Sequence, residues 1–198
     1  MKPLVAWVVI AVLGFVSSPA RAQEKDKKDK TEAKTQKVEL AADLTAEAPA
    51  DWKAQKPKSQ LRTHEFVLSS SEKDVADGIL FVMHFGSGSG GGLEENLKRW
   101  YGMVEQPDGS STEKAAKKDE IKDLAGGKVV WLDMSGTYLD RPMPASQQVT
   151  KRPNYRVFAA MIDAGTEGPY WVRAYGPESV MKKNRDGFER FLRSIAKK

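Results

Sequence analysis

The segment of this sequence with the clearest chemical potential is rich in glycine. Residues 86–92 are Gly-Ser-Gly-Ser-Gly-Gly-Gly, between an apolar run and an amphipathic run. Free backbone N–H groups at the start of a helix attract anions, so this loop is a candidate ligand-binding or anion-binding site. Glu94 and Glu95 in the first helical turn would repel phosphate. The candidate ligand-binding residues of this loop are Gly86, Ser87, Gly88, Ser89 and Gly90.

The loop also matches the dinucleotide-binding string Gly-x-Gly-x-x-Gly, from Gly86 to Gly91. That fingerprint needs a second parallel strand ending in an acidic residue about 20 residues further on. Pro107-Asp108-Gly109-Ser110 stand there instead, and no Gly-Lys-Ser/Thr follows the loop. The sequence therefore excludes a P-loop and does not favour a nucleotide site.

Ser87 and Ser89, with His84 just before them, are the nucleophiles and base that a hydrolase could use. A nucleophile elbow has the pattern Gly-x-Ser-x-Gly, and here Gly88 and Gly90 stand at the serine positions. We therefore expect no catalytic residue and a protein that is not an enzyme. A hydrolase without a recognised motif stays an alternative.

His64 and His84 are the only histidines in the sequence, and they fall on two predicted neighbouring strands. Two ligands are too few for a closed zinc site. Asp133, on a third predicted strand, would complete a site of two histidines and one carboxylate. The simpler interpretation is one ring packed on the sheet and one exposed. We expect neither a metal nor another cofactor.

Trp171, Arg173 and Tyr175 alternate along one predicted strand and therefore share one of its faces. Aromatic side chains on a sheet usually belong to the core. Arginine beside aromatic residues is, however, common at binding surfaces. These three residues are therefore a second candidate site, facing a partner or a ligand.

Alternation and apolar runs predict the strands that carry these residues. Residues 61–68 alternate, 78–85 are apolar, and the short polar link between them predicts an antiparallel hairpin. A second hairpin is predicted from residues 117–124 and 128–139. The last two strands are predicted at residues 155–162 and 170–175. Residues 38–40 predict a short first strand, and 44–52 an irregular segment with Trp52 as a core anchor. Residues 140–153 predict a long loop with three prolines, a possible lid.

Two amphipathic helices are predicted, at 93–101 and from Pro177 to the C-terminus. Leu93, Leu97 and Trp100 share one helical face in the first. In the second, Met181, Asn184, Phe188, Phe191 and Ile195 recur at steps of three and four. Gly187 lies inside this helix, which suggests close contact with a neighbouring segment.

The first 22 residues have the parts of a secretory signal: Lys2, an apolar core at 4–16, and Ala20-Arg21-Ala22 at the cleavage point. The apolar core is shorter than the roughly 18–20 residues that a spanning helix needs. We expect cleavage after Ala22 and a secreted or periplasmic protein without a transmembrane segment, an uncleaved anchor being the alternative. Residues 23–37 are charged and predict a disordered lead, with a solvated helix as the alternative.

Cysteine is absent from the sequence, which excludes disulfides, thiolate metal sites and cysteine nucleophiles. The net charge of the full chain is +5. Removing Lys2 and Arg21 with the signal leaves 30 basic residues against 27 acidic ones, a mild and interspersed excess. Nucleic-acid binding needs a clustered basic stripe, so we expect no nucleic-acid partner.

Residues 38–198 resemble the PsbP-like family, in particular its secreted bacterial members. The likeness lies in Gly78 to Trp100, in Trp171 to Pro177 with its Gly-Pro exit, and in Phe188 to Ile195. The family includes accessory proteins of photosynthetic oxygen evolution and a regulator of a nuclear-transport GTPase, and it has no common catalytic residues to carry over. The resemblance implies a single α+β domain, an antiparallel sheet of six to seven strands between two main helices in an α/β/α sandwich.

The function that follows from export and this resemblance is a non-catalytic binding or accessory module with a protein partner in the cell envelope or periplasm. The alternative is a protein that binds a small ligand or an anion through the loop at 86–92.

Overall fold

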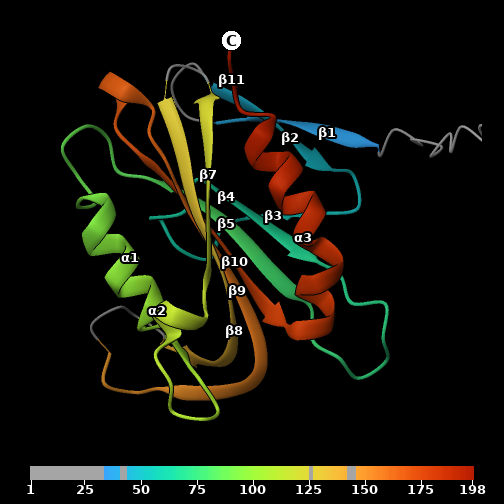
Figure 1. The fold of residues 1–198 in the computed structure, drawn as a ribbon. Coiled ribbons are helices and arrows are strands. Elements are labelled where there is room, and N and C mark those ends of the chain that lie inside the picture. The colour runs from blue at the N-terminus through green and yellow to red at the C-terminus, as the bar shows by residue number, and fades with distance from the viewer. Residues whose placement is uncertain (1–33, 41–43, 125–126, 142–145) are drawn as a thin grey trace, which may run out of the picture. The chain divides into compact units, whose positions relative to one another are not determined.

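The main sheet contains eight strands, and all its strand pairs are antiparallel. The computed structural model describes residues 34–40, 44–124, 127–141 and 146–198, which belong to one compact unit. The strand order is β3-β4-β5-β10-β9-β8-β6, and β7 also pairs with β8 (Figure 1). The strands are β3 (Lys53–Gln55), β4 (His64–Leu68), β5 (Gly78–His84), β6 (Val104–Glu105), β7 (Lys117–Leu124), β8 (Gly127–Asp140), β9 (Thr150–Ile162) and β10 (Tyr170–Pro177). The α+β class and the two predicted hairpins are confirmed, with one or two more strands in the sheet than expected.

A second, three-stranded sheet has the order β1-β2-β11. It consists of β1 (Thr35–Glu39), β2 (Leu44–Pro49) and β11 (Ala196–Lys197). The prediction that residues 44–52 are irregular is wrong for β2, in which Leu44, Ala46 and Ala48 are buried. Alanines give a weak strand signal, and β2 is held by partners from both ends of the domain. β1 begins inside the predicted lead, and the predicted signal lies outside the described residues.

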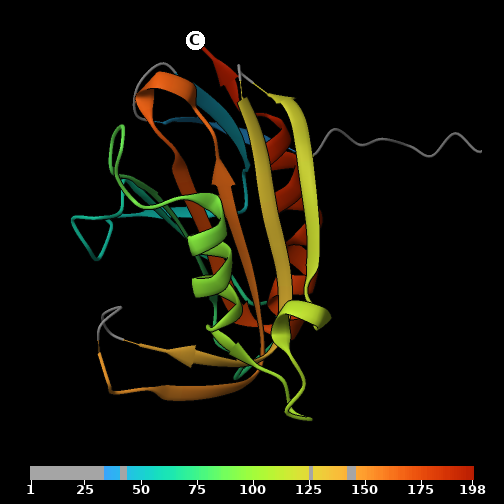
Figure 2. The ribbon, with the colours of Figure 1, turned by 60° about the vertical axis from the view of Figure 1, so that its left-hand side comes forward.

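The two main helices cover opposite faces of the large sheet, as Figures 1 and 2 show. Helix α3 (Glu178–Arg193) lies on one face and α1 (Leu93–Tyr101) on the other, with a short α2 (Thr112–Ala115) and a 3-10 turn, η1 (Gly165–Glu167). Helix α3 begins directly after Pro177, as the sequence predicts. None of the helices in the described part of the chain has the length and apolarity that a membrane crossing needs.

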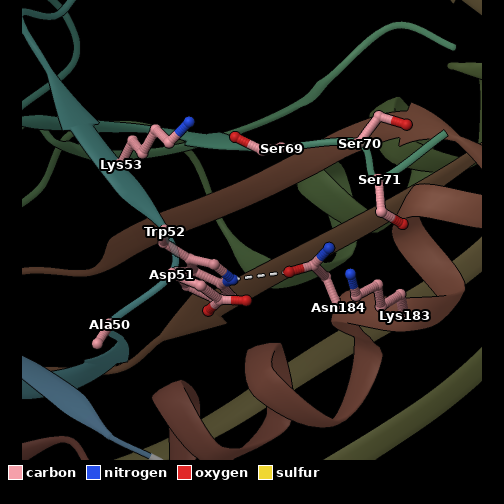
Figure 3. Close-up of a pocket in the computed structure, with 9 residues that line it drawn as sticks. All are labelled: Ala50, Asp51, Trp52, Lys53, Ser69, Ser70, Ser71, Lys183 and Asn184. Carbon is pink, nitrogen blue, oxygen red and sulfur yellow. Dashed lines mark hydrogen bonds between the residues drawn. The ribbon is translucent and has the colours of Figure 1, made fainter. Parts of the chain in front are cut away.

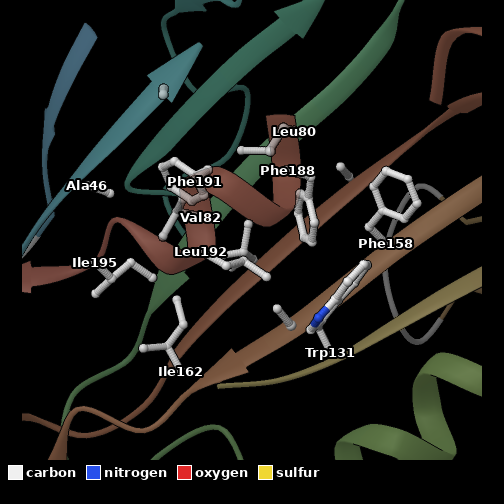
Figure 4. Packing of buried hydrophobic residues seen from close by; sticks show 14 of the residues in the cluster. Ala46, Leu80, Val82, Trp131, Phe158, Ile162, Phe188, Phe191, Leu192 and Ile195 are labelled. Atoms are coloured by element: carbon white, nitrogen blue, oxygen red, sulfur yellow. The ribbon is translucent and has the colours of Figure 1, made fainter. Parts of the chain in front are cut away.

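The larger core lies between the sheet and α3, which we call the α3 side. Trp131, Phe158 and Phe188 pack ring against ring there, next to Phe191 and Leu192 (Figure 4). Trp52 is 2% exposed and donates its Nε1–H to Asn184 Oδ1 at 2.8 Å, which confirms it as a core anchor. Gly187 allows this packing, because a Cβ there would lie 3.0 Å from Pro49.

The smaller core lies between the sheet and α1, the α1 side. Leu97 and Trp100 of α1 pack over Leu132, Met134 and Trp171. Helix α1 has nine residues and β8 has fourteen, lengths of about 14 Å and about 46 Å. The sheet face therefore continues well beyond the helix.

The β8–β9 hairpin is longer than the sequence predicts, and its far end bends towards the α1 side (Figure 2). Thr150–Pro153 belong to β9, so the predicted loop at 140–153 is too long at its C-terminal end. Pro153 fits into a strand here because the register shifts between Gly136 and Tyr138, opposite Pro153 and Asn154. Residues 142–145 of this loop lie outside the described residues.

Candidate functional site

The glycine loop lies against the α1-side core through Gly90. A Cβ added at Gly90 would overlap the indole ring of Trp171, and Gly90 has a φ of +86°. Asn96 of α1 holds the same loop by donating from Nδ2 to the carbonyl oxygens of Gly90, Gly91 and Gly92, at 3.1, 3.3 and 2.9 Å. The glycines therefore let the backbone cover Trp171.

The outer part of the loop, Ser87, Gly88 and Ser89, is exposed. At the start of α1 the Glu95 carboxylate accepts a hydrogen bond from the Gly92 N–H at 3.3 Å. An acidic side chain therefore already occupies part of the helix N-terminus. Anion binding by Gly86, Ser87, Gly88, Ser89 and Gly90 stays a prediction.

His84 does not pair with either loop serine. Its ring stacks on Tyr170 with 4.2 Å between centroids, and its Nε2 lies 2.8 Å from the Glu167 carbonyl oxygen. Among the described hydrogen bonds, none joins His84 to Ser87 or Ser89. The arrangement of nucleophile and base that the hydrolase alternative needs is not assembled here.

The predicted metal trio is not brought together either. Among the residues that the structure describes, no group of three His, Cys, Asp or Glu side chains could hold a metal ion. His64 pairs with Val82 across β4 and β5, and its pKa is lowered by burial. Asp133 is engaged by two arginines instead.

Asp133 is the centre of an ion-pair network on the α3 side. Arg156 of β9 donates to both of its carboxylate oxygens, at 2.6 and 2.8 Å. Arg185 of α3 donates to the same carboxylate at 3.1 Å. Asp133 is 4% exposed. The hydrogen bonds from Arg156 to Asp133 raise the pKa of Arg156. This network fastens α3 to β8 and β9.

Trp171, Arg173 and Tyr175 do share one face of β10, the α1 side. Trp171 is buried under the glycine loop, whereas Arg173 and Tyr175 are half-buried. Opposite them on β5 lie Met83, Phe81 and Ile79. The three residues thus run from a covered end at Trp171 to a more open end at Tyr175.

Four aromatic rings form a row beyond the end of α1. Tyr155 and Tyr138 stack with 6.2 Å between centroids, and Tyr138 and Tyr175 with 4.9 Å. Tyr175 meets Phe81 edge-on at 6.4 Å. The bend of the β8–β9 hairpin brings Tyr138 over the sheet, so that it touches Tyr175 on β10.

Arginines stand at both ends of this row. The Arg152 guanidinium lies 6.0 Å from the Tyr155 ring and pairs with Asp140 at 2.8 Å. At the other end, two guanidiniums lie on Phe81, that of Arg62 at 3.9 Å and that of Arg173 at 5.4 Å from the ring centroid. We call this surface the Tyr–Arg face; it consists of Arg62, Phe81, Tyr138, Arg152, Tyr155, Arg173 and Tyr175.

The two arginines on Phe81 differ in their partners. Arg62 donates to Glu65 at 2.6 Å, and Glu65 also accepts hydrogen bonds from Gln55 and from the Lys58 N–H. Arg173 has no ion pair with any described Asp or Glu residue, and its buried Nε has no hydrogen-bond partner. Burial lowers the pKa of Arg173, and the nearby Tyr138 phenol offsets part of that effect.

Tyr138 and Tyr175 are neutral at ordinary pH. Burial raises the pKa of Tyr138 to about 12 and also raises the pKa of Tyr175. A neutral phenol can donate a hydrogen bond. The Tyr–Arg face can therefore offer hydroxyl donors and ring surfaces beside Arg173, a cation with no ion pair to a described carboxylate.

A separate polar pocket of about 360 Å³ lies on the other side of the molecule, between α3 and the end of β4 (Figure 3). Lys53, Lys183 and Ser69–Ser71 line it, with Trp52 and Asn184 at its base. Both polar atoms of the Asn184 amide have a partner, since Oδ1 accepts from Trp52 and Nδ2 donates to the Val180 carbonyl, each at 2.8 Å. The rest of the lining is Ala50, Asp51, two exposed lysines and three serines. This composition is close to that of ordinary protein surface, so the pocket is a weaker candidate than the Tyr–Arg face.

Comparison with known proteins adds a likeness of fold. No protein-family model matches the chain, and no curated protein sequence does. Among solved structures, the cyanobacterial PsbP from Synechocystis sp. PCC 6803 is similar at 13% identity and a TM-score of 0.48, over 84% of this chain and 94% of that one. It is a member of the family that the sequence resembles.

Two further solved structures are similar over 82% of this chain. One is LpqN, involved in cell envelope biogenesis of Mycobacterium tuberculosis, at 8% identity, a TM-score of 0.49 and 90% of its own length. The other is the Ran-binding protein Mog1p of Saccharomyces cerevisiae, at 11% identity, a TM-score of 0.45 and 95% of its length. Similarities at this level carry no argument about what this chain binds.

The sequence identified Arg173 and Tyr175 as site residues but missed the other five residues of the face, Arg62, Phe81, Tyr138, Arg152 and Tyr155. Phe81 falls inside an apolar run and Arg62 at the edge of a strand, where neither attracts notice. Pairing of Phe81 with Arg173 requires β5 to lie next to β10, a contact between distant segments. The sequence shows that Tyr155 and Tyr138 lie on predicted strands. It does not show the register shift next to Tyr138, beside which the two rings stack.

Proposed function

We propose that this protein is a non-catalytic binding module, exported to the cell envelope or periplasm, which holds a protein partner on the Tyr–Arg face. Export is supported by the predicted signal at residues 1–22. Binding is supported by the side chains of the face, which are tyrosines and arginines. Tyrosine and arginine are, with tryptophan, the residues most enriched at the energetic centres of protein interfaces.

The observation that carries this proposal is the position of the row of rings. Tyr155 and Tyr175 are half-buried on a sheet face that α1 is too short to cover. Rings held by stacking on their neighbours lose little further conformational freedom when a partner covers them. They therefore offer contact area at a low entropic cost.

Exposed apolar residues adjoin the same face. Leu61 is 56% exposed and Phe85 is 38% exposed, and they are the exposed large hydrophobic residues in the described part of the chain. Phe85 lies 5.2 Å from the Trp171 ring, and Leu61 directly precedes Arg62. A partner on the Tyr–Arg face could extend over this rim.

The test is capture of partners from an envelope extract of the source organism, with purified mature protein as bait. Tyr155→Ala removes a half-buried ring of the row and is expected to weaken capture of a specific protein by about thirtyfold, as for an interface hot spot. Tyr101→Ala is the matched control, because Tyr101 is also half-buried but lies on α1. A partner retained equally by both variants would contradict the proposal, as would the absence of any specific protein.

Export is tested separately by sequencing the N-terminus of protein recovered from fractionated cells. The proposal expects the mature chain to begin at Gln23 and to be found outside the cytoplasm. A chain that begins at Met1 in the cytoplasmic fraction would contradict it.

A further inference from the structure

We propose that Arg62 and Arg173 form a notch that binds one carboxylate, the side chain of an Asp or Glu residue in an acidic segment of the partner protein. This inference rests on the proposed function, because it specifies the chemistry by which the Tyr–Arg face holds its partner. Four observations support it.

The first is the state of Arg173. Its Nε is buried and has no hydrogen-bond partner, and no Asp or Glu in the described residues forms an ion pair with it. Arg173 is half-buried, and a partly desolvated cation without a counterion is costly; its interaction with the Phe81 ring offsets only part of that cost. An external carboxylate would supply the missing anion.

The second is the position of Arg62. Its guanidinium lies on the same Phe81 ring as that of Arg173, and after burial, its positive charge is a further cause that lowers the pKa of Arg173. Arg62 uses its NH1 on Glu65, which leaves further N–H donors of the guanidinium for a second acceptor. A carboxylate between the two guanidiniums would be attracted by both.

The third is the charge balance of the face. Arg62, Arg152 and Arg173 are opposed by Glu65 and Asp140, so three cations face two anions and one positive charge is left. One carboxylate neutralises that charge. A phosphate, which carries close to two negative charges, would leave the notch negative beside two existing carboxylates. The balance therefore favours an acidic side chain over a phosphate group.

The fourth is the lining of the notch. The phenols of Tyr138 and Tyr175 adjoin Arg173 and stay protonated at ordinary pH, so they can donate to a carboxylate. Phe81 forms an apolar floor that is 3% exposed. Donors around a dry floor strengthen a charge-assisted hydrogen bond, because water competes less there.

The experiment is a titration followed by NMR on protein labelled with ¹⁵N, with the Arg173 Nε–H and the backbone amides of β10 as reporters. The probe is the dipeptide acetyl-Asp-Tyr-amide, and acetyl-Asn-Tyr-amide, of the same shape without the charge, is its control. Inorganic phosphate forms a third arm. The carboxylate probe is expected to shift these signals with a Kd on the order of 10 mM, as one charge-assisted hydrogen-bond pair allows.

Variants assign the effect to the notch. Arg173→Met is expected to weaken binding of acetyl-Asp-Tyr-amide by about tenfold or more. Arg193→Met is the matched control, because Arg193 lies on α3, over the opposite face of the sheet, and is paired with Glu189, so it is expected to leave the affinity unchanged. Equal shifts with the Asn dipeptide, stronger shifts with phosphate, or no shift at all would each overturn the inference.

Failure of the inference can be told from failure of the proposed function. If Tyr155→Ala loses the captured partner and Arg173→Met keeps it, the face binds a partner without using the notch, and only the inference fails. If both variants keep the partner, the proposed function itself fails.

Discussion

Two arginine clusters lie on opposite faces of the same sheet, and they differ in what neutralises them. On the α3 side, Arg156 and Arg185 share the buried carboxylate of Asp133. On the α1 side, Arg62 has Glu65, but Arg173 has no carboxylate of its own among the described residues. The first cluster is completed by the chain itself, and the second is left one anion short.

The difference follows the two helices. Helix α3 has sixteen residues and supplies Arg185 and Glu178 to its cluster, so the charges are satisfied within the fold. Helix α1 has nine residues, and Tyr155, Arg173 and Tyr175 on its side of the sheet are only half-buried. The polar groups of a cluster that a helix covers must find their hydrogen-bond and charge partners within the protein. Polar groups at the surface can find them in a binding partner. We therefore propose that Arg173, which has no ion pair with a described carboxylate, marks the side of the sheet that binds a partner.

The largest expected effect is on the completed cluster. Asp133→Ala leaves Arg156 and Arg185 without their anion and is expected to lower the free energy of unfolding by about 3–5 kcal/mol, measured by urea denaturation. Asp186→Ala is the control, since Asp186 also approaches Arg185 but is exposed, and it should change stability by less than about 0.5 kcal/mol. Equal losses in the two variants would show that Asp133 does not hold the network together.

A second effect defines where the open face ends. Gly90→Ala places a methyl group against the Trp171 ring and is expected to cost about 1–3 kcal/mol more than Gly88→Ala. Both glycines have a positive φ, but a Cβ at Gly88 would meet no heavy atom within 4 Å. Thermal unfolding of the two variants measures the difference. If it is zero, the loop is not packed on Trp171 and that ring belongs to the open face.

A third effect concerns pH. The pKa of Tyr138 is raised by burial from 10.0 to about 12, so the folded state keeps a proton that the unfolded state releases. The stability that this proton provides is fully present below pH 10 and is lost as the pH rises towards 12, by about 2 kcal/mol. Denaturation over this range should show a smaller loss in Tyr138→Phe than in the wild type. Parallel curves for the two proteins would contradict the burial of this phenol.

The smallest effect is expected at Arg173. Arg173→Met removes a cation without a counterion and keeps an apolar side chain over Phe81, so stability should stay within about 1 kcal/mol of the wild type. Arg156→Met, in the completed cluster, should be clearly destabilising because Asp133 loses its principal partner. If the two variants lose stability equally, Arg173 has an internal partner and the contrast between the clusters disappears.

Periodicity was enough to place most of the main sheet and both large helices. The apolar face of α3, from Met181 to Phe191, and the hairpin of β4 and β5 follow from spacing alone, because one face of each must be buried. Of the three-stranded sheet, the sequence predicted only part of β1, at residues 38–40, and missed β2 and β11. The central strand of this sheet is rich in small residues, and its third strand is the two-residue β11 at the far end of the chain.

The candidate site was predictable only in part, and β10 shows why. The alternation of Trp171, Arg173 and Tyr175 fixes that they share a face, whichever neighbours the strand has. Which of them is covered depends on the glycine loop, which lies over Trp171 and leaves Tyr175 half-buried. Asp133 illustrates the same limit, since the sequence suggested a metal ligand and the fold surrounds it with arginines.

By itself, the sequence determined the predicted secretory signal, the absence of cysteine, the strand and helix periods, and the shared face of Trp171, Arg173 and Tyr175. The tertiary structure decided that Arg62 and Arg173 meet on Phe81 and that Asp133 neutralises the arginines on the other face. Local spacing sets which way a side chain points, because the period of a strand or helix is a property of the backbone. Which charge it meets depends on segments far away in the chain, and their approach is set by packing of the whole sheet.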